Sequence, residues 1–245
     1  MGLGLCRSGL LWFGLYMITL NWGERDVDAG TASMLVNIGP ILLALLGGWL
    51  LHEGFPRRLE AGMAVSFGGV VVVGISESSG GHASVIGVAL CLVAAVCYAA
   101  GVVCQKLALR HASAVQVTAF GCVTGTAACL PFAGQFLAQL GSAPVSATLE
   151  VVYLGLFPTT LGFTTWAYAL ARTTSGRMGA TIYAVPMLVI IMSWLFLGQV
   201  PRWLAVAGGA ICLAGVAVSR SRSRADEKAS SQPVGATPKP EAPAR

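Results

Sequence analysis

The stretch GTASMLVNIGPILLALLGGWLLHE, residues 30–53, decides the fold of this chain. A helix needs about 20 mostly apolar residues to cross a bilayer, and this stretch is long enough. Pro40 lies near its middle, and its one carboxylate, Glu53, lies at its end. A second stretch, GRMGATIYAVPMLVIIMSWLFLGQ at residues 176–199, carries Pro186 at the matching place. The sequence therefore predicts two similar membrane-spanning segments, each with a proline inside it.

A constant shift of 146 residues relates the two stretches and extends beyond them on both sides. Downstream it carries Gly62 to Gly208, and upstream it carries Leu15 to Leu161. Chance similarity between helices rich in leucine, alanine and glycine would explain the apolar matches. It explains less easily why prolines and glycines match at one ungapped shift. We therefore favour a tandem duplication, which has to be recognised before the fold is inferred.

Composition places the chain among membrane proteins. Of its residues 56% are hydrophobic and only 10% are charged, whereas a soluble domain carries about 25% charged residues. The formal charge of +5 comes from short loops and a tail, so it does not indicate nucleic-acid binding. The seven cysteines show no metal-ligand spacing, and we expect neither a metal nor another cofactor. A soluble enzyme is excluded.

The apolar segments predict an all-α polytopic membrane protein, because backbone polar groups in lipid must be satisfied within helices or closed barrels and no barrel alternation is present. We expect about eight transmembrane helices. Their approximate bounds are Gly9–Trp22, Thr31–Leu51, Leu59–Ile75, Ile86–Leu107, Ala114–Leu137, Leu149–Ala171, Met178–Leu197 and Trp203–Ser219. The first also fits a signal peptide, but the repeat extends into it and no clear cleavage site follows, so we interpret it as a retained span.

The two copies differ in length. The second begins with two helices, about residues 86–107 and 114–137, that have no counterpart in the first. A complete unit would then have five helices, and we expect the first unit to lack its leading two. The predicted domains are a truncated first unit at residues 1–77 and a second unit at residues 84–219. The Pro-, Ala- and Ser-rich residues 220–245 form a disordered cytoplasmic tail.

An odd number of helices in a unit has a geometric consequence. Two tandem five-helix units enter the membrane in opposite directions and form an inverted pair. Such pairs place a substrate site near the midplane, between the repeats, and alternate its access by moving one repeat against the other. This symmetry is the main reason to expect a transporter.

The charges of the loops predict the orientation, since cytoplasmic loops are enriched in Lys and Arg. Loops with basic residues alternate with loops such as 76–84 that have none, with Arg25 and Arg202 as exceptions. We expect both termini to be cytoplasmic. The basic residues on that side are Arg7, Arg57, Arg58, Lys106, Arg110, Arg172, Arg177, Arg220, Arg222, Arg224 and Lys228.

Over about residues 9–219 the chain resembles the EamA-type transporters of the drug/metabolite transporter superfamily. The resemblance rests on Pro40 and Pro186, on Glu53 at a helix end, and on two glycine-rich helices, AGMAVSFGGVVVVG and AGGAICLAGVAVS. It departs in carrying Gln199 where the family commonly has Glu and in lacking the first two of ten helices. The resemblance implies a permease that moves small metabolites or drug-like solutes, often outward, across the bacterial cytoplasmic membrane.

Several residues are candidates for the site. Pro40 and Pro186 are either hinges beside a central cavity or static kinks. Asn37 and Tyr183 are equivalent under the shift, one turn before each proline, and either line that cavity or bond to another helix. The glycine stripes are packing faces, either within one chain or between the chains of a homodimer.

Three further residues are open to two interpretations. Tyr98 and Trp166 could form walls for a flat or amphipathic solute, although aromatic residues also anchor helices at the interface. Glu53, at the cytoplasmic end of its helix and near basic residues, is either a structural ion pair, which we favour, or a proton-coupling group. No charged residue occupies the middle of a predicted span, which argues against proton antiport through these helices.

The favoured function is a permease that moves a small organic solute by alternating access. Its partners would then be that solute and membrane lipid, with no nucleic acid. The alternative is a membrane scaffold or inactive transporter fragment, which would have a packed interior around Asn37 and Tyr183. An intramembrane enzyme is least supported, because no catalytic constellation is present in the spans.

Overall fold

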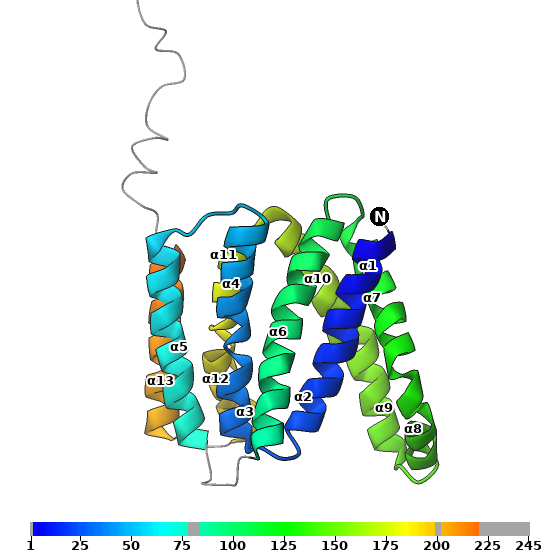
Figure 1. The fold of residues 1–245 in the computed structure, drawn as a ribbon. Helices are drawn as coiled ribbons and strands as arrows, with labels where there is room; N and C mark the ends of the chain where they lie inside the picture. Colours follow the sequence, from blue (N-terminus) through cyan, green and yellow to red (C-terminus); the bar gives the residue numbers. More distant parts are fainter. Residues whose placement is uncertain (1, 78–83, 199–201, 221–245) are drawn as a thin grey trace, which may run out of the picture.

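The computed structural model describes residues 2–77, 84–198 and 202–220, and within them every regular element is helical (Figure 1). The predicted tail at residues 220–245 lies almost wholly outside the described residues, as does Gln199. The elements are α1 (Gly2–Ser8), η1 (Gly9–Tyr16), α2 (Met17–Gly23), α3 (Ala29–Val36), α4 (Gly39–Leu50), α5 (Arg57–Glu77), α6 (Val85–Ala108), α7 (Ala114–Cys129), η2 (Leu130–Phe132), α8 (Ala133–Leu140), α9 (Val145–Leu154), η3 (Gly155–Gly162), α10 (Phe163–Arg172), α11 (Ser175–Ile182), α12 (Val185–Leu197) and α13 (Trp203–Arg220).

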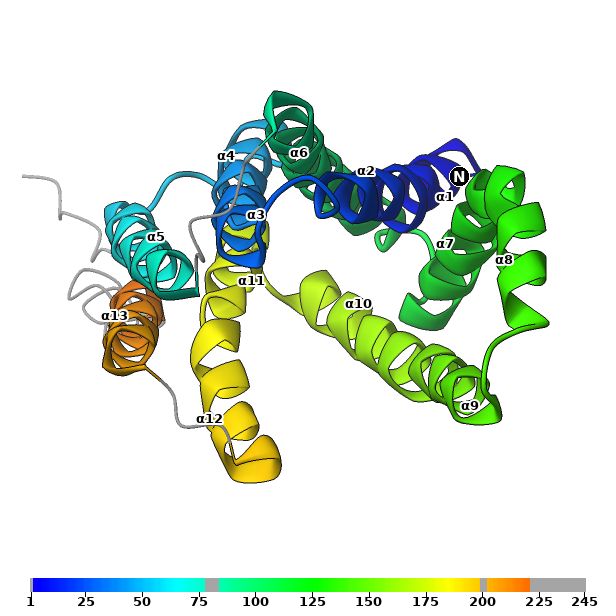
Figure 2. The ribbon, with the colours of Figure 1, turned by 90° about the horizontal axis from the view of Figure 1, so that it is seen from below.

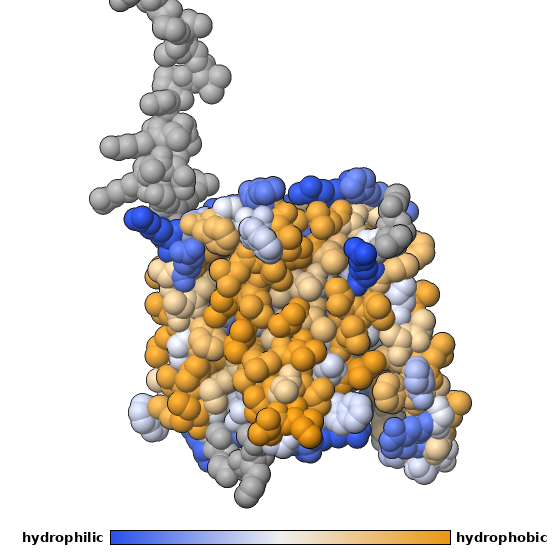
Figure 3. Space-filling view, in the orientation of Figure 1, coloured by the Kyte–Doolittle hydropathy of each residue, from blue (hydrophilic) through white to orange (hydrophobic). Residues whose placement is uncertain are grey.

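Seven helical stretches of the described chain are long and apolar enough to cross a membrane. The sequence predicts about eight, and the remaining one is the continuous helical run of α1, η1 and α2, which lies beside α6 in Figures 1 and 2. Apolar side chains form a wide band across the face seen in Figure 3, with hydrophilic ones gathered at its two ends. The all-α polytopic membrane class is therefore confirmed. The seven stretches are Gly30–Leu50, Arg57–Ser76, Val85–Ala108, Ala114–Leu140, Val145–Arg172, Ser175–Phe196 and Trp203–Arg220.

Polar side chains fix where several helices begin. Asp28 accepts a hydrogen bond from the Thr31 N–H at the start of α3, and Ser84 accepts one from the Gly87 N–H at the start of α6. Ser113 caps α7 together with Gln116. Such caps satisfy N–H groups that have no partner in the first helical turn. The predicted helix ends lie within a few residues of those in the structure, except that the first helical run begins at Gly2 rather than at Gly9.

Helices α5 and α13 pack against each other in opposite directions. A Cβ on Gly62 would lie 2.5 Å from the Gly215 carbonyl oxygen, and one on Gly69 would lie 2.6 Å from the Gly208 carbonyl oxygen. As residue numbers rise along α5 they fall along α13, so the two helices are antiparallel. Because they are equivalent under the 146-residue shift, their antiparallel packing is what an inverted pair requires.

Residues related by the shift also touch each other. The Ser66 hydroxyl donates to the Cys212 carbonyl at 3.0 Å, and the Cys212 thiol lies 3.4 Å from the Ser66 carbonyl. A pair that contacts itself in this reciprocal way lies on a two-fold axis, here one that relates α5 to α13. The unit boundaries 1–77 and 84–219 stay a prediction.

A π-helix occurs at the same place in both copies. The segments η1 (Gly9–Tyr16) and η3 (Gly155–Gly162) are separated by the same 146-residue shift, although their sequences differ. A π-helix is rare and is frequently found at functional sites. In η1 it positions Trp12 in the core and Tyr16 beside the pocket described below. The sequence did not predict either π-helix.

The main core lies between α4, α6, η1 and α10. Its buried members include Trp12, Leu43, Val102 and Leu170. By contrast, the span at residues 145–172 is exposed along most of its length, so lipid would cover it. A second cluster, which contains Met63, Val70 and Tyr183, packs α5, α11 and α13 together, and the candidate site lies beside it.

Candidate functional site

Both predicted prolines break their helices. Helix α3 ends at Val36 and α4 begins at Gly39, and α11 ends at Ile182 and α12 begins at Val185. Pro40 and Pro186 each occupy the first turn of the second half, where a missing N–H is tolerated. The sequence predicts a kink or hinge at each proline, and the structure interrupts the regular α-helix there for two residues that keep helical backbone angles. Whether the breaks move stays a prediction.

The break in the first copy frees a backbone acceptor. The Ile41 N–H, which would bond to Asn37 in a continuous α-helix, donates instead to the Ile38 carbonyl at 3.0 Å. The Tyr183 hydroxyl donates to the Asn37 carbonyl at 2.8 Å. Tyr183 and Asn37 are equivalent under the shift, so this bond joins the two breaks across the pseudo-symmetry axis.

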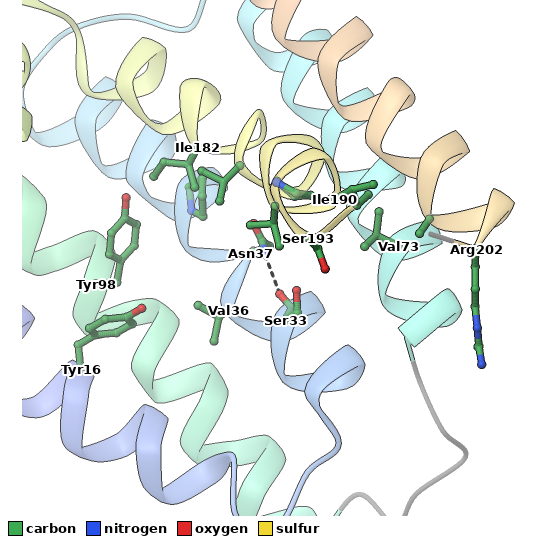
Figure 4. Close-up of a pocket in the computed structure, with 15 residues that line it drawn as sticks. Tyr16, Ser33, Val36, Asn37, Val73, Tyr98, Ile182, Ile190, Ser193 and Arg202 are labelled. Atoms are coloured by element: carbon green, nitrogen blue, oxygen red, sulfur yellow. Dashed lines mark hydrogen bonds between the residues drawn. The ribbon is translucent and has the colours of Figure 1, made fainter. Parts of the chain in front are cut away.

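The two candidates therefore differ in position. Tyr183 is fully buried and forms the interhelical bond, whereas Asn37 lines a pocket. The Asn37 side-chain amide donates to the Ser33 carbonyl at 2.8 Å, one turn earlier in α3 (Figure 4). The backbone carbonyl of Asn37 therefore accepts the hydrogen bond from Tyr183, and its side-chain amide forms part of the pocket wall.

We expect Tyr183→Phe to lower the free energy of unfolding by about 1 kcal/mol, because the variant keeps the ring but leaves the Asn37 carbonyl without its donor. Denaturation in mixed detergent micelles would measure the change. Tyr153→Phe is the matched control, since Tyr153 is exposed and stacks only on Phe157. Equal stability of the two variants would contradict a structural role for the Tyr183–Asn37 bond.

A pocket of about 690 Å³ lies beside both breaks. Most of its wall is apolar and comes from α3, α5, α11, α12 and α13. Figure 4 shows Tyr16 and Tyr98 on one side of this space and Ile190 and Ser193 on the other, with Asn37 and Ser33 between them. The lining residues are Tyr16, Ser33, Val36, Asn37, Pro40, Val73, Tyr98, Ile182, Val185, Pro186, Val189, Ile190, Ser193, Arg202 and Ala205.

Of the sequence-predicted residues, Asn37, Tyr98, Pro40 and Pro186 come together at this pocket. Trp166 does not line it. Instead, it packs against Trp12, with ring centroids 5.9 Å apart. Tyr98 lies near Tyr16, with centroids 5.9 Å apart, so two tilted phenol rings form one wall.

Four polar lining residues escape prediction, namely Tyr16, Ser33, Ser193 and Arg202. Each is present in only one copy, so the repeat gives no sign of them. Ser33 precedes Asn37 by one turn, and Ser193 interrupts the apolar run MLVIIMSWLFL. A polar residue alone in such a run is the signal that could have found Ser193, and the spacing of one turn from Asn37 could have found Ser33. Arg202 lies at the pocket edge and donates to the Ser76 carbonyl at 2.7 Å.

Several buried polar groups of the described residues have no hydrogen-bond partner. They are the Tyr98 hydroxyl, the Trp166 indole N–H, both side-chain amide atoms of Gln105 and the Ser76 hydroxyl. Leaving such a group unpaired costs about 1–3 kcal/mol, so native proteins rarely do so without a reason. Tyr98 lies at the inner end of the pocket, whereas Trp166 and Gln105 do not line it.

Glu53 forms an ion pair across helices. Its Oε1 lies 2.5 Å from the Lys106 Nζ, with 12% of the Glu53 and 15% of the Lys106 side chain exposed. Glu53 also accepts the Ser175 backbone N–H at 2.6 Å, at the first residue of α11, whose N-cap is Thr174. Lys106 donates in addition to the Thr173 carbonyl. Three elements, α4, α6 and the start of α11, meet at this carboxylate. The sequence indicates an ion pair but not Lys106 as the partner.

The pocket can bind but offers little for catalysis. Among the described residues that line it, Arg202 alone carries a charge. No group of three or more His, Cys, Asp or Glu in the described chain could hold a metal. Two phenols, an amide and two serine hydroxyls within an apolar wall suit reversible binding of a small amphipathic solute.

Comparison with known proteins agrees with this geometry. The model of the EamA-like transporter family matches residues 3–75 and 85–221. The "Probable terminal-alkyne amino-acid exporter" of Streptantibioticus cattleyicolor is 35% identical over 232 residues, which cover 94% of this chain and 76% of that protein. The "Probable amino-acid metabolite efflux pump" of Salmonella typhimurium is 24% identical over 228 residues, covering 89% of this chain and 75% of that protein.

An uncharacterized transporter of Bacillus subtilis is 32% identical over 208 residues, covering 85% of this chain and 68% of that protein. A crystal structure matches with a TM-score of 0.74 at 21% identity, covering 88% of this chain and 75% of the other chain. At that identity the match supports the fold alone.

Proposed function

Because this chain belongs to the EamA-like transporter family, we propose that it exports a small amphipathic organic solute of the amino-acid-derivative type by alternating access. It is an integral membrane transporter rather than an enzyme. We further propose the bacterial cytoplasmic membrane as its location, with the side that carries Arg57 and Arg58 facing the cytoplasm.

One observation carries the proposal, namely the pocket at the two helix breaks. Broken helices that meet between inverted units are where transporters of this architecture bind their solutes. The pocket reaches Val73 near the end of α5 and Ala205 near the start of α13, and its inner end meets the core that contains Leu43 and Leu170. A site that reaches one end of the bundle and is bounded by packed residues at its inner end is expected of one of two alternating states.

The chemistry of the wall supports the solute class. An apolar chain fits against Val36, Ile182 and Val189, and the polar head fits against the phenols and the Asn37 amide. Two relatives bear names that refer to amino acids or their metabolites. A scaffold without transport would instead have a packed interior around Asn37, and the pocket there speaks against that alternative.

The test is solute flux in proteoliposomes. L-propargylglycine, an amino acid with a terminal alkyne, serves as the probe because a fluorescent azide reports it after cycloaddition. Common amino acids and aromatic metabolites complete the panel. We expect protein-dependent flux of the alkyne amino acid. Flux no greater than in protein-free liposomes for the whole panel would contradict the proposal.

Asn37→Leu is expected to lower this flux about tenfold, because it removes the polar group at the centre of the pocket wall. Asn21→Leu is the matched control, since the Asn21 amide makes the same local bond, to the Met17 carbonyl at 2.7 Å, but does not line this pocket. Initial rates at matched protein density would measure both. A similar loss in both variants would exclude a specific role for Asn37.

A further inference from the structure

Tyr98 forms the inner end of the pocket, and a further buried polar side chain, Gln105, lies beyond it on the same helix. Gln105 lies seven residues further along α6, two helical turns away, and Val102 lies between them on the same face. Tyr98 and Val102 face the main core, and Gln105 is fully buried. This face therefore leads from the inner end of the pocket into the main core.

The unpartnered polar groups are concentrated along this face. Of the four described residues with such groups, Tyr98 and Gln105 lie on it, and Trp166 packs on the same core from α10. Ser76 lies at the other end of the bundle. An amide with neither donor nor acceptor satisfied is poorly suited to a permanently closed core. It is well suited to a surface that is wet or occupied in another state.

An ion pair lies at the far end of this face of α6. Lys106 follows Gln105 directly and pairs with Glu53, which also accepts the Ser175 N–H. The pair therefore joins α6 to the end of α4 and to the start of α11. It lies at the end of the bundle that carries Arg57 and Arg58.

We propose that the solute enters past the Glu53–Lys106 pair and follows the Tyr98–Val102–Gln105 face of α6 to the pocket. Tyr98 and Gln105 form a second polar subsite, which binds the hydrogen-bonding head of an amphipathic solute when this path opens. The solute class rests on the proposed function. The path rests on the unpaired groups and the ion pair alone.

Thiol labelling tests the path without any solute. Val102→Cys is compared with native Cys91, which is equally buried on α6 but packs against Val27 and Ala32, away from the path. A charged, membrane-impermeant methanethiosulfonate is added to the Arg57 side or to the opposite side of oriented vesicles. Peptide mass spectrometry then reports the modification of each cysteine.

We expect Val102→Cys to react at least about tenfold faster than Cys91 from the Arg57 side, and faster still when Glu53→Gln is added. Reaction no faster than that of Cys91, reaction only from the opposite side, or no response to Glu53→Gln would overturn the path. Labelling without flux of any solute in the panel would support the path and contradict the proposed solute class. Flux of the alkyne amino acid without labelling would support the solute class and contradict the path.

Gln105→Met tests the subsite. Methionine has a similar volume and no unpaired donor or acceptor, so the variant should be at least as heat-stable as the native chain while flux of L-propargylglycine falls about tenfold. Gln139→Met, on the exposed surface of α8, controls for the exchange itself. Unchanged flux with higher stability would show that Gln105 is only a poorly satisfied core residue and would overturn the subsite.

Discussion

Gly69→Leu is expected to prevent α5 from packing on α13 and to abolish the folded protein. A Cβ at this position would lie 2.6 Å from both the Cys212 backbone nitrogen and the Gly208 carbonyl oxygen. Both are backbone atoms, so no side chain can move aside. Even Gly69→Ala should cost about 1–3 kcal/mol, the range measured for overpacked interiors. Thermal unfolding in detergent, followed by size-exclusion chromatography, would measure the loss.

The adjacent glycine is the matched control. Gly68 lies on the same helix and is exposed, and a Cβ added to it would meet no atom of another residue within 4 Å beyond its own stretch of helix. Gly68→Leu should therefore fold and remain as stable as the native chain. Loss of folding in both variants would mean that glycine is needed along α5 for another reason than its contact with α13.

The sequence predicts most of this fold because one physical signal dominates it. Spans of about 20 apolar residues are read from hydropathy, and helix ends follow from caps such as Asp28 and Ser84. The matched prolines locate both helix breaks. The constant shift predicts that α5 corresponds to α13 and that Asn37 corresponds to Tyr183. It does not predict that the members of each pair are in contact.

The missed features have physical reasons. The π-helices η1 and η3 coincide under the shift, yet only η3 contains a proline, and no residue type marks the wider turn. Tyr16 and Ser193 lack a polar counterpart in the other copy, so a search based on symmetry passes over them. We expect solute specificity to depend on residues that differ between the two copies, such as Tyr16 and Ser193.

Long-range pairing is the other limit of prediction. Lys106 is visible in the sequence as a basic residue near a helix end, and Glu53 as a carboxylate near another. Arg57 and Arg58 are closer to Glu53 along the chain than Lys106 is. Only the packing of α4 against α6 brings the Lys106 ammonium to Glu53.

Breaking the Glu53–Lys106 pair gives the second large effect. Glu53→Ala should lower the free energy of unfolding by about 3 kcal/mol, because it leaves a mostly buried ammonium unpaired and removes the acceptor of the Ser175 N–H. Lys106→Ala should cost a similar amount. The double variant should cost clearly less than the two single losses combined, since it leaves neither charge unpaired.

Denaturation in mixed micelles would complete this double-mutant cycle, with Glu60→Ala as the control because Glu60 is exposed on the neighbouring helix α5. Losses that simply add would mean that Glu53 and Lys106 act independently, and the pair would then be no gate. A strong coupling together with faster labelling of Val102→Cys would tie the same two side chains to both stability and access. That combination is expected of a contact that holds one half of the bundle closed and has to open for each transported molecule.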